Sequence, residues 1–231
     1  EDSAESCGAI YKGKKIGTWS DIATFSFEEK KIITTGDGGM ICLNDKKKYE
    51  KIKSLSFHGW NIDPWKRHVR SFGSNNKFSR HWNYEIQNLG YKYNMNDLMA
   101  SIGLAQLKKI NSFNFKRQKI LKRYLDGIKK LKYIKPTYPY ELKNSSYWLF
   151  SINTNYRDEL IDYLKTKNIS TAVHFVPLPL NKLYKKYKSK SLKNTMTIWK
   201  KIVSLPFFPD LENKKIDYII NCLKSFDKKF N

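Results

Sequence analysis

Phe25-Ser26-Phe27-Glu28-Glu29-Lys30-Lys31-Ile32-Ile33-Thr34-Thr35-Gly36-Asp37-Gly38-Gly39 is the most informative segment of this chain. Its first residues belong to an apolar run, Ile22 to Phe27, that predicts a buried strand. The strand leads into Lys31, and a Thr-Thr-Gly turn and a pair of glycines follow, which permit a sharp change of direction. A lysine presented on a turn after a buried strand is suited to form an imine with an aldehyde.

This segment resembles the lysine-bearing segment of the DegT/DnrJ/EryC1/StrS family of sugar-nucleotide aminotransferases. The family pattern is Ser-Phe-x-x-x-Lys-x-x-Thr-Thr-Gly-Glu-Gly-Gly, and Asp37 replaces the commoner Glu. Laid on that pattern, Lys31 is the catalytic lysine that holds pyridoxal phosphate as an imine, and Lys30 is its neighbour. The resemblance therefore implies an enzyme that uses pyridoxal phosphate as its cofactor.

Three further residues have cofactor-binding roles under this resemblance. Asp2 pairs with the ring nitrogen and keeps the ring protonated as an electron sink, and Ser26 contacts the cofactor phosphate through its hydroxyl. Glu5 lies where many members carry Gln or His beside the ring, and a Glu there resembles members that make perosamine-type amino sugars. Taken alone, Asp2 is a surface carboxylate and Ser26 an ordinary strand residue.

A second block, Gly90 to Leu98, reads Gly-Tyr-Lys-Tyr-Asn-Met-Asn-Asp-Leu and resembles the family's Gly-Tyr-x-Tyr-Arg/Asn-Met-x-Asp block. In the family this block reaches across a dimer interface to the partner's cofactor, so the resemblance implies a homodimer with shared active sites. Lys92 and Asn94 are the cofactor-binding candidates in this block, and their combination resembles the member that makes 4-amino-4-deoxy-arabinose for lipid A. Which of the two reaches the cofactor is open, although a Lys suits a phosphate as a point charge.

His58 and His174 are the candidate substrate-binding residues. His58 follows Phe57 and His174 precedes Phe175, and both match family positions near the sugar-nucleotide pocket. A purely structural role is also open for each histidine.

The resemblance implies an α/β chain of the fold type I class of pyridoxal phosphate-dependent transferases, similar to aspartate aminotransferase. Residues 1–112 are expected to form the later part of the large cofactor-binding domain, and residues 113–231 a small α+β domain at the C-terminal end of a longer protein. Residues 58–90 lack periodicity and are expected to form a functional loop or lid. Periodicity predicts helices at 45–55, 96–110, 112–131, 157–167, 191–202 and 214–226, and strands at 9–11, 22–27, 39–43, 147–153 and 170–175.

The composition of the 231 residues bears on other classes of protein. A net charge of +23 is typical of nucleic-acid-binding proteins. The lysines are spread along the whole chain, however, and Arg is scarce relative to Lys, which favours a compositional origin such as an AT-rich genome. No nucleic-acid partner is therefore expected, and no membrane partner either, because no apolar run is long enough to span a bilayer.

The three cysteines, Cys7, Cys42 and Cys222, are widely spaced and lack the pairing typical of a metal site. They are interpreted as small buried thiols, which suits a reducing cytosol. No metal is expected, and the location is expected to be cytoplasmic.

The resemblance predicts an aminotransferase that moves the amino group of L-glutamate to a nucleotide-linked keto-sugar. The acceptor is expected to be a 4-keto-6-deoxyhexose or a 4-keto-pentose, for surface polysaccharide or lipid A modification. A deoxysugar dehydratase uses the same cofactor, but those enzymes replace the lysine with His, whereas Lys31 is present here. Two further hypotheses stay open at this point: a non-catalytic or truncated member of the family, and a basic nucleic-acid-binding protein.

Overall fold

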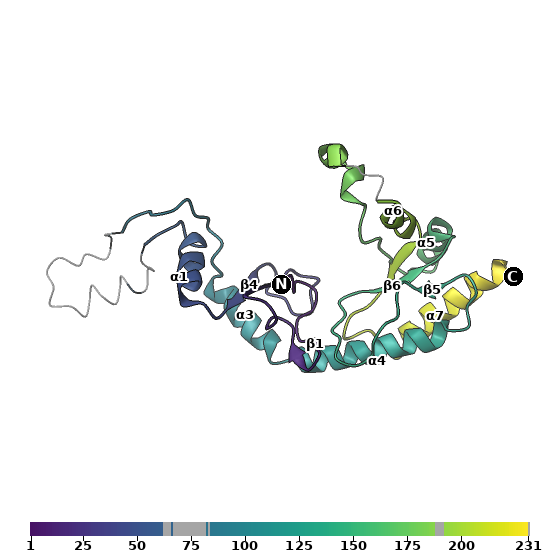
Figure 1. Cartoon of the computed structure of the whole chain (residues 1–231). Coiled ribbons are helices and arrows are strands. Elements are labelled where there is room, and N and C mark those ends of the chain that lie inside the picture. The colour runs from purple at the N-terminus through teal and green to yellow at the C-terminus, as the bar shows by residue number, and fades with distance from the viewer. Residues whose placement is uncertain (62–65, 67–81, 83, 188–191, 231) are drawn as a thin grey trace.

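The computed structural model describes residues 1–61, 66, 82, 84–187 and 192–230 of the chain. The described residues form a mixed α/β structure in which the long helix α4 (Ile110–Ile128) runs between two regions. Figure 1 shows an elongated molecule, with α1 at one end and the C-terminus at the other. The N-terminal region contains the segment around Lys31, and the C-terminal region contains a three-stranded sheet.

Two antiparallel hairpins make up the strands of the N-terminal region. Strand β3 (Ile22–Ser26) pairs with β4 (Gly39–Leu43), so that Ser26 lies opposite Gly39 at the end of the ladder next to the connecting segment 27–38. A Cβ on Gly39 would lie 2.6 Å from the carbonyl oxygen of Phe25, so the close approach of the two strands requires glycine there. The smaller hairpin joins β1 (Ile10–Tyr11) to β2 (Lys14–Lys15).

Helices α1 (Lys46–Leu55) and α3 (Asp97–Leu107) confirm the helices predicted at 45–55 and 96–110, and both begin after a capping residue. The side chain of Asp45 accepts a hydrogen bond from the amide of Lys48, and that of Asn96 accepts one from the amide of Met99. No residue of α3 is buried against the rest of the described structure, and Leu98 is 78% exposed.

Between these helices, the chain returns on itself through a close backbone contact of two glycines. A Cβ on Gly90 would lie 2.2 Å from the backbone nitrogen of Gly59, so the contact leaves no room for a side chain at Gly90. The amide of His58 donates to the carbonyl of Tyr91, and isolated bridges join Phe57 to Lys92 and Trp60 to Ile86. Most of the loop predicted at 58–90 lies outside the described residues.

The C-terminal region surrounds an antiparallel sheet in the order β5–β6–β7. Aromatic stacking ties α4 to this sheet, since the rings of Tyr124 and Phe150 lie 4.9 Å apart and the Tyr124 hydroxyl donates to the carbonyl of Pro206. Helix α7 packs along α4 (Figure 1), and Ile216 and Leu223 are completely buried in the shared core. Among the described residues after α4, the elements are β5 (Lys135–Pro136), β6 (Phe150–Asn153), α5 (Arg157–Thr166), α6 (Lys193–Trp199), β7 (Ile202–Leu205), α7 (Asn213–Asp227) and the 3₁₀ helices Leu178–Leu180, Lys182–Tyr187 and Lys228–Phe230.

Two predictions in this region were wrong in part. The strand predicted at 170–175 is reduced to a single bridge between Ala172 and Ser204. The helix predicted at 191–202 runs only from Lys193 to Trp199, and its predicted first residue lies outside the described residues. Ile202 instead begins β7, which pairs antiparallel with β6, so tertiary pairing of β-branched residues overrides the local helical pattern.

All three cysteines are free thiols, but only Cys222 is buried, so the prediction of buried thiols was wrong for Cys7 and Cys42, which are half-buried. Burial raises the pKa of the Cys7 thiol, and the nearby Cys42 adds a smaller increase. In the described part of the chain, no helix is both long enough and apolar enough to cross a membrane. The domain boundary at residue 112 stays a prediction, and it falls within the first turn of α4.

Candidate active site

The turn after β3 directs Lys31 inward and leaves its neighbour Lys30 in solvent. The amide of Lys31 donates to the carbonyl of Glu28 at 3.0 Å, and Ile32 and Ile33 are buried directly after it. The Lys31 side chain is 15% exposed, whereas that of Lys30 is 70% exposed and pairs with Glu29. Burial of the two isoleucines therefore anchors the turn and selects Lys31 as the lysine that faces the interior.

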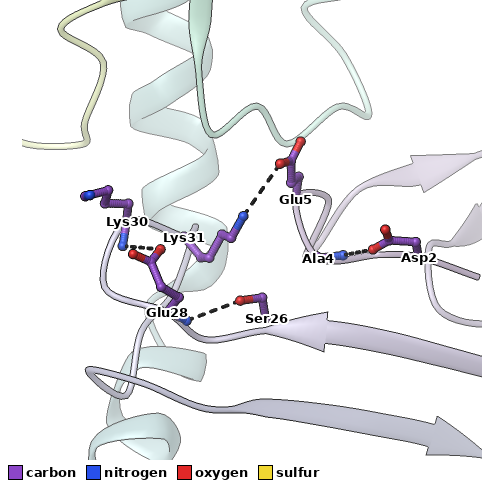
Figure 2. A network of polar contacts seen from close by, with 7 residues as sticks. All are labelled: Asp2, Ala4, Glu5, Ser26, Glu28, Lys30 and Lys31. Atoms are coloured by element: carbon purple, nitrogen blue, oxygen red, sulfur yellow. Dashed lines mark hydrogen bonds and ion pairs between the residues drawn. The ribbon is translucent and has the colours of Figure 1, made fainter. Parts of the chain in front are cut away.

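The Lys31 amine lies between a carboxylate and an aromatic face. Its Nζ is 3.6 Å from Glu5 Oε1, and Figure 2 shows the two side chains pointing toward one another. The same Nζ lies 4.1 Å from the centroid of the Trp148 ring, a cation–π distance. Three segments far apart in the sequence thus meet at one nucleophilic atom.

Asp2 and Ser26 lie on neighbouring backbone segments near this amine (Figure 2). Asp2 forms a parallel bridge with Thr24 of β3, and its Oδ1 accepts a hydrogen bond from the amide of Ala4 at 3.1 Å. Ser26 ends β3, and its hydroxyl accepts a hydrogen bond from the amide of Glu28 at 3.4 Å (Figure 2). The structure therefore brings Asp2, Glu5, Ser26 and Lys31 into one neighbourhood.

A cavity of about 590 Å³ opens between the N-terminal segment and the C-terminal region. Glu5, Trp148 and His174 line it, together with Tyr138 and Ser146. The Ser146 hydroxyl is buried and has no hydrogen-bond partner among the described residues, so the cavity wall offers an unsatisfied polar group. Its lining of aromatic rings and hydroxyls suits a polar ring-shaped ligand.

His174 is held at the cavity wall by Ser204. Its Nδ1 lies 2.8 Å from Ser204 Oγ, and its ring centroid is 5.7 Å from that of Trp148. Burial lowers the pKa of His174. The negative charge of Glu5 raises it in part, and the positive charges of Lys30 and Lys31 lower it further. The neutral imidazole is therefore favoured at neutral pH, and it can both donate and accept hydrogen bonds.

His58, Lys92 and Asn94 form a second group at the base of the loop held by Gly59 and Gly90. The Lys92 ammonium donates to Asn94 Oδ1 and lies 4.5 Å from the centroid of the Phe57 ring. The backbone of His58 has a φ of +59°, and its ring contacts that of Phe57 edge-on. Within the described residues, no hydrogen bond or ion pair connects this group to the one around Lys31.

Sequence reasoning missed Trp148 and two polar residues of α4 that lie behind the site. Burial lowers the pKa of Arg117 to about 10, and its Nη1 donates to the carbonyl of Ile32 at 3.5 Å. Asn114 Nδ2 donates to the carbonyl of Cys7 at 3.3 Å. The sequence signal that could have identified Arg117 as a site residue is that it is an arginine within a lysine-rich helix. For Trp148 there was no such signal beyond its place in a predicted strand.

The sequence profile of the DegT/DnrJ/EryC1/StrS aminotransferase family matches residues 1–224. The chain belongs to this family. It is 40% identical over 234 residues to the uncharacterized protein MJ1066 of Methanocaldococcus jannaschii, covering 97% of this chain and 58% of that protein. It is 32% identical over 238 residues to the spore coat polysaccharide biosynthesis protein SpsC of Bacillus subtilis, covering 99% of this chain and 59% of that protein.

Solved structures show the same family likeness. The putative sugar aminotransferase Spr1654 from Streptococcus pneumoniae, in its PMP form, matches with a TM-score of 0.85 and 30% identity over 99% of this chain and 58% of that chain. Helicobacter pylori PseC, an aminotransferase involved in the biosynthesis of pseudoaminic acid, matches with a TM-score of 0.85 and 26% identity over 98% of this chain and 59% of that chain.

Spr1654 has also been solved in a PLP form. This family depends on pyridoxal phosphate and has the type I fold, which confirms the predicted family and fold class. The chain spans just under three fifths of the length of these relatives, between 58% and 59%.

Proposed function

We propose that this protein acts as a pyridoxal phosphate-dependent aminotransferase that moves the amino group of L-glutamate to a nucleotide-linked keto-sugar. The acceptor is a 4-keto-6-deoxyhexose or a 4-keto-pentose used in building a surface polysaccharide or modified lipid A. The single observation that carries the proposal is the half-buried Lys31 amine, which the chain directs at Glu5 and Trp148 on the edge of a cavity.

The side chains around Lys31 fit the cofactor by their chemistry. An amine is available for its aldehyde in Lys31, a carboxylate for its pyridine nitrogen in Asp2, and a hydroxyl for its phosphate in Ser26. When bound, pyridoxal phosphate supplies an aldehyde that takes up the amino group and a ring that accepts electrons from the neighbouring carbon.

Within this arrangement, the chain's own residues bind, orient and move protons. Lys31 Nζ carries a proton to and from the reacting carbon, acting as base and then as acid. Glu5 Oε1, 3.6 Å from that nitrogen, orients the amine and offers a second place for its proton. Asp2 would pair with the ring nitrogen of the bound cofactor and so stabilise the protonated ring.

The acceptor sugar is proposed to enter the cavity beside Lys31. His174 is fixed by Ser204 and is favoured in its neutral form, so it can hydrogen-bond a sugar hydroxyl without adding charge. His58, Lys92 and Asn94 lie in the second group and are proposed to act at the active site of a partner subunit in a homodimer, where Lys92 would meet a phosphate.

An absorbance scan of the purified protein with added pyridoxal phosphate, before and after L-glutamate, tests the proposal. We expect a band of lysine-attached cofactor that shifts to the amine form when L-glutamate is added. Lys31→Ala should abolish the band. Lys30→Ala is the matched control, because it removes the neighbouring exposed lysine, and it should leave the band intact.

A wild-type protein that gives no band would contradict the assignment and favour a non-catalytic member of the family. A band that survives in Lys31→Ala would show that another lysine holds the cofactor. With the first half of the reaction established, nucleotide-linked 4-keto-sugars can be screened by following the return of the original band.

A further inference from the structure

Three polar side chains of α4 contact three separate segments of the candidate active site. Asn114, Arg117 and Gln118 are spaced by three and four residues, so they share one face of the second and third turns. Asn114 Nδ2 donates to the carbonyl of Cys7 at 3.3 Å, and Gln118 Nε2 donates to that of Ser145 at 3.3 Å.

Arg117 lies between these two residues in the sequence and contacts the third segment. Its Nη1 donates to the carbonyl of Ile32 at 3.5 Å, and its side chain is buried. Each of the three carbonyls lies within three residues of Lys31 itself or of a side chain that contacts its amine. Cys7 follows Glu5, Ile32 follows Lys31, and Ser145 precedes Trp148.

Polar groups are retained on this buried face although they are not fully satisfied. Asn114 Oδ1 and Arg117 Nε are buried and have no hydrogen-bond partner among the described residues. An apolar side chain would avoid that loss, so packing alone does not account for Asn and Arg here. Space is also tight, since a Cβ on Gly8 would lie 2.6 Å from Asn114 Nδ2.

We infer that Asn114, Arg117 and Gln118 are positioning residues, which set the Lys31 amine against Glu5 and Trp148 by holding three backbone carbonyls from one helix face. The inference rests on the proposed function for the role of Lys31. None of the three side chains needs to touch substrate or cofactor. Their effect passes through the backbone of the segments they hold.

Segment-resolved hydrogen exchange on the whole protein tests this arrangement without any cofactor. Arg117→Met, Asn114→Ala and Gln118→Met are compared with Lys119→Met, which changes an exposed residue of the same helix. We expect the exchange rate to rise at least tenfold in the segment that each side chain holds. That segment is residues 28–36 for Arg117→Met, residues 1–9 for Asn114→Ala and residues 143–149 for Gln118→Met. The β6 strand should remain protected as in the wild type, and Lys119→Met should change none of these segments.

A second readout measures the amine itself. Each variant is treated with pyridoxal phosphate and borohydride, and the fraction of Lys31 that is covalently trapped is followed by mass spectrometry. Arg117→Met should trap Lys31 at least tenfold more slowly, Arg117→Lys should recover part of the rate, and Lys119→Met should behave as the wild type.

Exchange that stays at the wild-type level in all three segments, or that rises equally in β6, would overturn the positioning role. Should Arg117→Met fail to fold, Asn114→Ala and Gln118→Met decide by the same exchange pattern. A wild type whose Lys31 is not trapped at all counts against the proposed function, while the exchange pattern still judges the role of the helix face.

Discussion

In the C-terminal region, α4 and α7 share a hydrophobic core with the sheet, and side chains such as Leu121, Phe150 and Leu223 have no exposed surface. In the N-terminal region, by contrast, α1 and α3 contain no buried residue, and α3 exposes Leu98 and Leu104. The residues proposed for chemistry lie mainly in the region that builds little core of its own. Their geometry therefore depends on contacts with α4 and with the cavity wall of the other region.

Helix α4 has a different role in each region. Its first turns meet the N-terminal region through the polar side chains of Asn114 and Arg117, and its later turns enter the C-terminal core through Leu121 and Tyr124. Apolar burial contributes most of the stability of a fold, whereas hydrogen bonds fix the distance and orientation of the groups they join. We therefore expect mutations in the C-terminal core to lower stability, and mutations where α4 meets the N-terminal region to change the position of the active-site segments.

Leu121→Ala should give the largest loss of stability. The side chain is completely buried between α4 and the C-terminal core, so its removal leaves a cavity and should lower the free energy of unfolding by about 2–5 kcal/mol. Denaturant titration followed by circular dichroism measures the loss. A change below about 1 kcal/mol would mean that the C-terminal region is not the stable part of the molecule.

Asp227→Ala should give the next largest effect, because it removes a buried acceptor. The two carboxylate oxygens accept hydrogen bonds from the backbone amides of Lys132 at 2.9 Å and Tyr133 at 2.8 Å. Leaving both amides unpaired should cost about 1–3 kcal/mol. Asp227→Asn keeps one acceptor oxygen and should lose less in the same titration; no loss of stability in Asp227→Ala would show that the two hydrogen bonds do not matter.

The alkaline pH dependence should report on Arg117. Burial lowers its pKa to about 10 in the folded chain, below the ordinary value of an unfolded arginine. The unfolded state then binds more protons above about pH 10, so this group adds stability as the pH rises through that value. Relative to Arg117→Met, the wild type should gain about 1 kcal/mol between about pH 9 and about pH 11. Parallel stability curves for the two proteins would show that Arg117 is not buried as a charge.

Leu98→Ala should give the smallest effect, because the side chain is 78% exposed. Exposed positions usually change the free energy of unfolding by less than about 0.5 kcal/mol. The measurement should be made at two protein concentrations. A loss comparable to that of Leu121→Ala, or one that depends on concentration, would show that α3 is covered in solution.

Most helices and the lysine segment could be predicted from the sequence, for physical reasons that differ. Periodic apolar residues made α7 predictable, and Asn96 marked the start of α3, since both signals are local. The assignment of Lys31 rested on a motif. Strand β7 was missed because its pairing with β6 lies outside any local window, and the contact of Trp148 with Lys31 joins residues far apart in the chain.

The glycine contact between Gly59 and Gly90 has a consequence for how the length of the chain between them can vary. Because backbone meets backbone there, and the amide of His58 donates to the carbonyl of Tyr91, the two ends of the interval 59–90 are held together. Lengthening a closed flexible loop costs only about 0.6 kcal/mol for each doubling. For the loop predicted at 58–90, a change in the number of residues between the two glycines should therefore cost little stability and leave β4 and α3 in place.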